Sequence, residues 1–322
     1  MEMILKTVAV AAAILAASAD LTCRETGQAS PDGTYKYAEK GFEDLFMDIY
    51  YPDAGSATAD LDGNAKPVVI FMFGGGFFSG ERDNPAYARW FDALTANGYM
   101  VVSIDYRLGL KGSDKAGIAQ VNLIDNAIHM AVEDLFSATE FLLYNADVLE
   151  IDPDNIVISG SSAGAIAVLQ ADYELSNGSP CAEVLPVGFR YAGVMAFSGA
   201  ILTRDWGLRY KTPPAPVLLL HGTEDRIVNY GQIRFFNLGL YGADKIAKRF
   251  RKEGYLYNII RFAGHGHEIA GCMYETLPYQ LHFLEENIMA GSRKVIDATV
   301  DDPAIPSGDG GSRTRKELYG GN

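Results

Sequence analysis

Cysteine and basic residues are scarce in this chain of 322 residues. The three cysteines, Cys23, Cys181 and Cys272, can form at most one disulfide and always leave an odd thiol. The 27 lysines and arginines stand against 41 aspartates and glutamates, which gives a formal net charge of −14. That balance neither neutralises a row of phosphates nor favours an anionic membrane surface. We therefore expect no nucleic-acid partner.

Long apolar runs are also missing, except near the N-terminus. There a single cation, Lys6, precedes a small and apolar run from Thr7 to Ala17, and Ala17-Ser18-Ala19 fits the rule for signal-peptidase cleavage. The run is too short to anchor the chain stably in a bilayer. We expect residues 1–19 to be a signal peptide and the protein to be secreted or periplasmic. A buried first helix and a lipoprotein attached through Cys23 remain alternatives.

An oxidising compartment would permit a disulfide between Cys181 and Cys272. Two ordinary buried thiols are equally compatible with the sequence. The pairing is left open at this point.

No internal repeat and no second domain boundary interrupts the chain between about Thr34 and Gly291. We expect residues 20–33 to be a linker and residues 34–291 to form one catalytic domain. The remainder, 292–322, is expected to be a disordered C-terminal tail, because its last twenty residues are rich in Gly, Ser, Pro and charge.

Short apolar runs alternate with stretches of helical spacing along the domain. The runs are Phe46–Tyr51, Val68–Phe73, Met100–Asp105, Ile156–Gly160, Gly193–Phe197, Val217–Leu220 and Asn258–Phe262. The helical stretches between them include Asn122–Leu149, Asp244–Lys252 and Tyr274–Met289. Runs rich in Val and Ile are typical of strands buried on both faces. The pattern predicts an α/β fold, a mostly parallel sheet covered by helices, with its chemistry at the carboxyl ends of the strands.

A Gly-x-Ser-x-Gly motif stands between a strand and a helix. Gly160-Ser161-Ser162-Ala163-Gly164 follows the strand and precedes Ala165–Leu175, which has helical composition. Glycine suits both flanks because a Cβ there would clash with the strand or the helix. This context makes Ser162 the candidate nucleophile.

A run of three glycines follows an earlier strand, in Phe73-Gly74-Gly75-Gly76-Phe77-Phe78-Ser79-Gly80. Such a run lets backbone N–H groups approach a ligand oxygen, as an oxyanion hole requires. We assign the donors to the amides of Gly75, Gly76 and Ala163. The alternative is a flexible surface loop, which the flanking aromatic residues disfavour because they would hold the loop against the core.

At these two motifs the sequence resembles the α/β-hydrolase superfamily. It is most similar to the carboxylesterase-like and small secreted esterase families, which share Gly-Gly-Gly-Phe-x-x-Gly and Gly-x-Ser-Ala-Gly. The resemblance covers about Tyr35 to Ile288. Many relatives have His before the three glycines, where this chain has Phe73. Because that His usually organises the loop, the departure leaves the expected oxyanion hole in place.

The resemblance also suggests the acid partner of the serine. After the strand Val217–Leu220, the residues from His221 to Val228 look like the family's His-Gly-x-x-Asp-x-x-Val turn, which makes Asp225 the triad acid. Glu224 is the competitor and is expected to be solvated. His221 is expected to be a hydrogen-bonded turn residue and not the base.

Two histidines follow the strand Asn258–Phe262 and compete for the role of base. Gly264-x-Gly266-His267-Glu268 resembles the family's Gly-x-Gly-His loop with its usual offset, which favours His267. Choosing His265 would shorten the loop by two residues, and this choice stays open. No nearby Cys or further His completes a metal site with the pair, so no metal is expected.

These residues predict a serine-dependent carboxylic-ester hydrolase that acts through an acyl-enzyme and needs no cofactor. The longest insertions, Arg107–Gln120 and Leu202–Pro214, are short, so we expect little or no cap domain over the site. An open site would admit short acyl or feruloyl esters of carbohydrates. Trp206 and Tyr210 either stack on such a substrate or pack inside the protein.

Two other functions are compatible with the same fold. An exported serine peptidase or amidase would use the same triad, but such enzymes often carry a propeller or gating domain for which this chain has no room. A non-catalytic binding protein on a hydrolase scaffold typically lacks the Ser or the His, and both are present here. The ester hydrolase is therefore the leading hypothesis.

Overall fold

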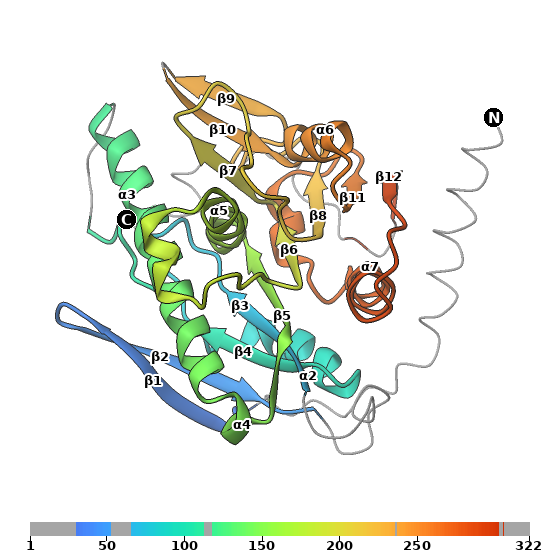
Figure 1. The fold of residues 1–322 in the computed structure, drawn as a ribbon. Coiled ribbons are helices and arrows are strands. Elements are labelled where there is room, and N and C mark those ends of the chain that lie inside the picture. The colour runs from blue at the N-terminus through green and yellow to red at the C-terminus, as the bar shows by residue number, and fades with distance from the viewer. Residues whose placement is uncertain (1–29, 53–65, 113–117, 236, 303–304, 306–322) are drawn as a thin grey trace.

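The computed structural model describes residues 30–52, 66–112, 118–235, 237–302 and 305. The expected signal peptide, Cys23 and most of the expected linker and tail lie outside these residues. The prediction of a mostly parallel sheet with helices on both faces is confirmed (Figure 1).

A sheet of nine strands forms the centre of the described chain, in the order β1-β2-β4-β3-β5-β6-β8-β11-β12. Its strands are β1 (Gly33–Lys40), β2 (Glu43–Tyr50), β3 (Lys66–Met72), β4 (Met100–Ile104), β5 (Ile151–Ser161), β6 (Gly193–Phe197), β8 (Val217–Gly222), β11 (Tyr257–Phe262) and β12 (Ile296–Val300). The strands from β4 to β12 in this order run parallel, whereas β1 and β2 form an antiparallel hairpin at one edge.

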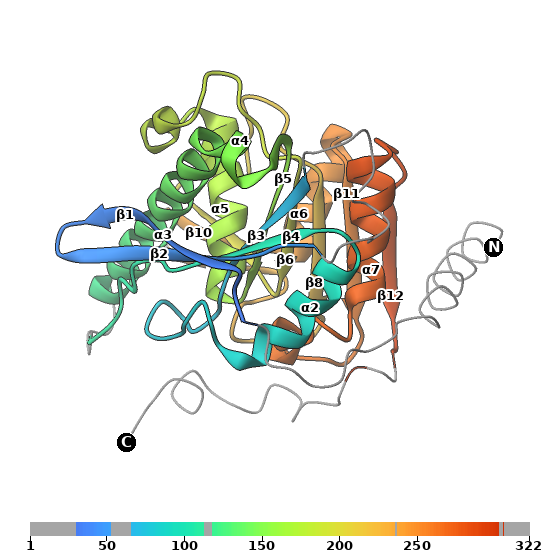
Figure 2. The same ribbon diagram turned by 90° about the horizontal axis from the view of Figure 1, so that it is seen from below.

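Helices cover both faces of the sheet. They are α2 (Ala88–Ala96), α3 (Ile118–Tyr144), α4 (Ala146–Leu149), α5 (Ala163–Asn177), α6 (Ala243–Glu253) and α7 (Leu277–His282). Short 3₁₀ helices form η2 (Pro85–Tyr87), η3 (Pro180–Val184) and η4 (His267–Gly271), and the π-helix η5 (Phe283–Met289) continues α7. Figures 1 and 2 show α3, α5 and α6 on one face and α2 and α7 on the other. Across the second face, Trp90 Nε1 of α2 donates a hydrogen bond to Gln280 Oε1 of α7 at 2.7 Å. None of the described helices is long and apolar enough to be a membrane span.

The central strands are buried on both sides, as the continuous apolar runs predict. Every residue of β3 from Val68 to Met72 is completely buried. Phe71 on this strand packs edge-on against Trp90 and Phe91 of α2, with ring centroids 5.0 and 5.6 Å apart. Burial of apolar surface on both faces is the main force that holds such a layered fold together.

The prediction that the disordered tail begins at residue 292 is wrong. Residues Ile296–Val300 form β12, which pairs in parallel with β11 and extends the domain beyond residue 291. The strand is short and carries a charged residue, so its composition does not stand out from a loop. Asp297 secures it: its carboxylate accepts hydrogen bonds from Arg261 Nη1 at 2.5 Å and from Tyr257 at 2.8 Å, and it also pairs with Arg251.

A second, three-stranded sheet was not predicted. It is formed by β7 (Ala200–Thr203), β9 (Gln232–Phe235) and β10 (Leu238–Gly242), in the order β7-β10-β9. Strand β7 packs along α5, where the backbone N–H of Leu202 donates to Gln170 Oε1 at 2.9 Å. The strands have four or five residues each, too few for a clear alternation of apolar and polar side chains.

Of the two aromatic residues in the second insertion, Tyr210 is a packing residue. Its ring centroid lies 5.2 Å from that of Tyr173 on α5 and 5.7 Å from those of Phe250 and Tyr255. Tyr173 is far from Ser162, about 16 Å along the helix at the usual rise per residue. The insertion therefore places Tyr210 between α5 and α6.

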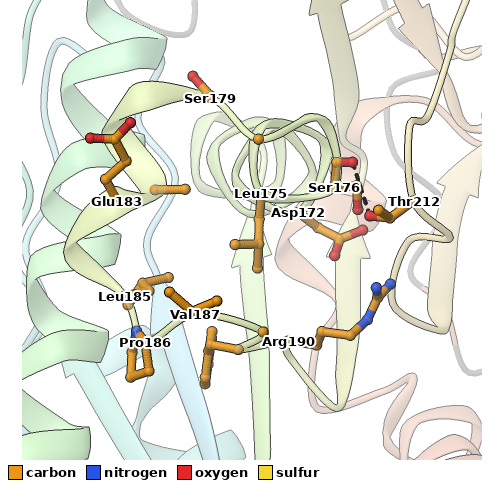
Figure 3. A pocket seen from close by; sticks show the side chains of 14 residues that line it. Asp172, Leu175, Ser176, Ser179, Glu183, Leu185, Pro186, Val187, Arg190 and Thr212 are labelled. Atoms are coloured by element: carbon orange, nitrogen blue, oxygen red, sulfur yellow. Dashed lines mark hydrogen bonds between the residues drawn. The ribbon is translucent and has the colours of Figure 1, made fainter.

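A cavity of about 500 Å³ lies at the far end of α5 from Ser162 (Figure 3). Asp172 lies on its wall near Thr212 and Arg190, and both of its carboxylate oxygens lie 3.2 Å from the backbone N–H of Ala215. Burial raises the pKa of Asp172 to about 6, although the Ala215 N–H and the charge of Arg190 lower it. This carboxylate is 7% exposed, and burying a charged group without a close counter-charge costs stability.

We predict that Asp172→Asn stabilises the protein in a pH-dependent way. Because the folded-state pKa of about 6 lies above the usual 3.8, the ionised carboxyl disfavours folding increasingly from about pH 4 to pH 6. The amide should remove this penalty, so the variant's advantage in unfolding free energy should grow by about 3 kcal/mol over that range and then level off. Urea unfolding from pH 4 to 7 measures it.

The matched control is Asp154→Asn, since Asp154 is exposed. Its unfolding free energy relative to the wild type should stay flat with pH. If both variants show the same profile, the buried carboxyl of Asp172 does not carry the predicted penalty.

Candidate active site

Ser162 occupies a sharp turn between β5 and α5. Its backbone has φ 52° and ψ −112°, a conformation that costs energy for a residue with a side chain and is typical of functional turns. The turn is fastened to the next strand, because the Ser162 N–H donates to the Phe197 carbonyl at 2.9 Å. The Ser162 side chain is thus held at the carboxyl edge of the sheet.

Both flanking glycines are required by close backbone contacts. A Cβ on Gly160 would lie 2.3 Å from the carbonyl carbon of Gly164. A Cβ on Gly164 would lie 2.0 Å from the carbonyl oxygen of Met72 at the end of β3. The motif is therefore explained by the tightness of the turn.

The structure brings Ser162, His267 and Asp225 together in one chain of hydrogen bonds. Ser162 Oγ lies 2.8 Å from His267 Nε2, and His267 Nδ1 lies 2.8 Å from Asp225 Oδ2. His267 begins the short turn η4, which follows β11, and Asp225 lies three residues beyond the end of β8. In this order an imidazole can take the proton of the serine hydroxyl, while the carboxylate orients and stabilises the imidazole.

Asp225 is 2% exposed, yet its charge is well supported. Its Oδ1 accepts the backbone N–H groups of Ile227 at 2.9 Å and Val228 at 3.0 Å. Burial alone would raise the pKa of Asp225, but contacts with His221 and His267 lower it well below its usual range. The carboxylate therefore stays ionised at neutral pH, with Oδ2 facing His267 Nδ1 as a hydrogen-bond acceptor.

His265 has different partners from His267. Its Nδ1 lies 3.1 Å from Glu268 Oε1, and the same oxygen accepts the Gly266 N–H at 2.9 Å. These contacts hold the loop that presents His267. In the described ranges, no group of three or more His, Cys, Asp or Glu side chains is arranged to hold a metal ion.

The glycine-rich loop lies beside the nucleophile. A Cβ built on Gly74 would be 3.3 Å from the Ser162 Cβ, so the loop backbone approaches the serine closely. Gly75 and Gly76 have φ values of 127° and 66°, and a Cβ on Gly75 would lie 1.9 Å from the Ser79 carbonyl oxygen. Ala163 is the first residue of α5, whose leading N–H groups have no partner within the helix. The proposed amide donors therefore belong to segments that flank Ser162.

Two aromatic residues pin this loop, as the sequence suggested. Phe73 is stacked on Tyr106 with ring centroids 4.4 Å apart, and Phe77 meets the same ring edge-on at 6.2 Å. The Tyr106 hydroxyl donates to the Phe73 carbonyl at 2.8 Å. Tyr106 was not singled out from the sequence, although its place two residues after the end of β4 is a signal for it.

The hydroxyl of Ser161, next to the candidate nucleophile, has a different hydrogen-bond partner. Its hydroxyl donates to the Ala270 carbonyl at 2.7 Å and so ties the turn to η4. This contact keeps Ser161 apart from the chain of hydrogen bonds at Ser162.

The two described cysteines are free thiols, so the possible disulfide between them does not form. Cys272 is buried beside the histidine loop and donates to the Glu268 carbonyl at 3.2 Å. Burial raises the pKa of Cys272 to about 12, which makes it an ordinary thiol at neutral pH.

Comparisons with known proteins agree with the fold described above. A family model described as BD-FAE matches residues 47–177. The native structure of Est2, a thermophilic esterase from Thermogutta terrifontis, has a TM-score of 0.58 at 21% identity, covering 79% of this chain and 91% of that one. The chain has the α/β-hydrolase fold. Est2 has also been solved with propionate bound and with butyrate bound.

Similar sequences among curated proteins cover part of this chain. Gut esterase 1 of Caenorhabditis briggsae is 35% identical over 104 residues, which are 32% of this chain and 18% of that protein. Phenmedipham hydrolase of Pseudarthrobacter oxydans is 32% identical over 112 residues, 34% of this chain and 21% of that protein. The matches thus span about a fifth of the length of these relatives.

We predict that Gly164→Ala disrupts the turn. Because the added methyl group would meet the backbone of β3 at 2.0 Å, the strand or the helix must move. We expect a loss of about 3 kcal/mol or more in unfolding free energy, measured by chemical denaturation.

Gly271→Ala is the control, since an added Cβ there meets nothing within 4 Å. It should change the unfolding free energy by less than about 1 kcal/mol. A Gly164→Ala variant as stable as the wild type would show that the turn is less tight than described.

Proposed function

We propose that this protein is a serine-dependent carboxylic-ester hydrolase with Ser162, His267 and Asp225 as its catalytic triad. The observation that carries the proposal is the pair of 2.8 Å contacts that link Ser162 Oγ to His267 Nε2 and His267 Nδ1 to Asp225 Oδ2. The resemblance to esterases in sequence and in fold supports the choice of an ester bond.

The proposed reaction has two steps. Ser162 Oγ attacks the ester carbonyl carbon while His267 Nε2 takes the hydroxyl proton, and Asp225 stabilises the resulting imidazolium. The C–O bond to the alcohol breaks and the alcohol leaves with the proton from His267. Water, deprotonated by His267, then attacks the acyl-enzyme, releases the carboxylic acid and restores the Ser162 hydroxyl.

The negative charge on the carbonyl oxygen needs donors during both steps. We propose the amides of Gly75, Gly76 and Ala163 for this role. Support comes from the approach of the loop backbone to Ser162 and from the rigid anchoring of the loop on Tyr106. Rigid donors are effective because they need no reorganisation as the charge develops.

For the substrate, we propose short acyl or feruloyl esters of carbohydrates. We also propose that residues 1–19 direct the export of the protein, so that it acts on these esters outside the cytoplasm. The propionate and butyrate bound to Est2 support short acyl groups. Trp206 supports a sugar or aromatic group as part of the substrate, since the residue is 75% exposed and the Arg234 guanidinium lies 4.2 Å from its ring centroid. Such a ring offers an apolar face for stacking.

We predict that Ser162→Ala and His267→Ala each lower kcat/KM for p-nitrophenyl acetate by about 10⁴-fold, because triad members act as a unit. Ser162→Ala should also abolish covalent labelling by a fluorophosphonate probe. Steady-state kinetics and gel fluorescence measure the two effects.

The neighbouring residues supply matched controls. Ser161→Ala and His265→Ala remove a hydroxyl and an imidazole that have other partners, Ala270 and Glu268, so each should cost less than about tenfold. If His265→Ala abolished activity and His267→Ala did not, the base would be His265 and the proposed triad would be wrong.

We also predict that kcat/KM is highest for acetyl to butyryl esters and falls for longer chains. Each methylene buried in an apolar tunnel would add about 0.8 kcal/mol to binding, so a tunnel would make kcat/KM rise with length. A series of p-nitrophenyl esters measures the profile, with feruloyl esters as a separate aromatic case. A maximum at long fatty chains would contradict the short-acyl proposal and leave the triad unaffected.

A further inference from the structure

His221 lies at the carboxyl end of β8, beside the turn that carries Asp225. It is completely buried, and its Nε2 lies 2.9 Å from the Val228 carbonyl oxygen and 3.2 Å from Asp225 Oδ2. The same Asp225 oxygen lies 2.8 Å from His267 Nδ1. Two histidines, one near the end of β8 and one at the start of η4, therefore meet one carboxylate.

The surroundings of His221 fix which ring nitrogen carries the proton. A carbonyl oxygen and an ionised carboxylate only accept hydrogen bonds, so Nε2 must be the protonated nitrogen. Its Nδ1 has no hydrogen-bond partner within the described residues. The ring therefore faces the turn with Nε2–H as its donor.

This donor closes a ring of contacts around the carboxylate. The Val228 N–H donates to Asp225 Oδ1 at 3.0 Å, and the Val228 carbonyl receives His221 Nε2. One residue of the turn is thus held on both of its backbone groups, by the acid and by His221. The Asp225 carboxylate is thereby fixed with Oδ1 toward the turn and Oδ2 toward His267.

We propose that His221 is a positioning residue for the triad: its Nε2–H fixes the turn Asp225–Val228 and keeps Asp225 Oδ2 directed at His267 Nδ1. This inference rests on the proposed function, because it needs Asp225 to act through His267. Outer hydrogen bonds of this kind set the orientation of the groups that perform the chemistry.

If His221 served only to pack against its neighbours, its variants would behave differently. The His221 ring meets Tyr230 edge-on with centroids 5.6 Å apart, and Tyr230 is itself held by Arg261 Nε at 2.7 Å. Phenylalanine would keep this aromatic contact and lose the donor. Glutamine would lose the ring but can place an amide N–H near the position of Nε2. The two substitutions therefore separate packing from hydrogen bonding.

The test compares His221→Gln and His221→Phe with the wild-type protein, using kcat and KM for p-nitrophenyl acetate and the rate of fluorophosphonate labelling. We expect His221→Phe to lower kcat and the labelling rate by about 10- to 100-fold with KM within about twofold. His221→Gln should retain both within about fivefold of the wild type, since the donor is restored. Thermal unfolding measures whether each variant is folded.

His221→Asn serves as a further variant, because its amide is one methylene too short to reach the Val228 carbonyl. It should behave like His221→Phe and replaces it if the phenylalanine does not fold. Equal kcat in the Gln variant and in the folded Phe or Asn variant would overturn the positioning role. If wild-type Ser162 is not labelled and no ester is hydrolysed, the proposed function itself fails and the role of His221 falls with it.

Discussion

The site depends on the register of four neighbouring parallel strands, β5, β6, β8 and β11. Ser161 pairs with Phe197, Phe197 with Leu220, and Leu220 with Ile260. These strands therefore end at one level of the sheet, and the loops that follow three of them carry Ser162, Asp225 and His267. A slip of one residue in any strand would turn its side chains to the opposite face and separate the three groups.

Local contacts then fix the geometry of the three groups that the strand register brings together. The strained backbone at Ser162 is held by a hydrogen bond to Phe197 and by glycines that let β3, β5 and α5 approach. On the acid side, the buried Asp225 keeps its charge because two backbone N–H groups and two histidines face it. In the proposed mechanism, strain on one side and a stabilised negative charge on the other pre-organise the serine for attack.

The features that could be predicted from sequence are those in which one residue type is required locally. Glycine at 160 and 164 follows from the tight turn, and the buried strands follow from their continuous apolar runs. Asp225 and His267 were predicted from a resemblance, because loop residues far apart in sequence carry no local pattern that joins them.

The remainder depends on contacts between distant segments. Strand β12 is held by Asp297 and its partners on β11 and α6, none of which its own sequence reveals. The partners of Tyr210 likewise come from other elements. Short strands and packing contacts between distant segments are therefore missed even when the fold class is correctly predicted.

The most direct measurement is the identification of the covalent intermediate. The protein is mixed with p-nitrophenyl acetate, quenched with acid within one turnover, digested and examined by mass spectrometry. A single acetyl group on Ser162, which disappears as p-nitrophenyl acetate is exhausted, is the expected result. Turnover of the ester with no acetyl group on Ser162, or with the acetyl group on another residue, would contradict the proposed mechanism.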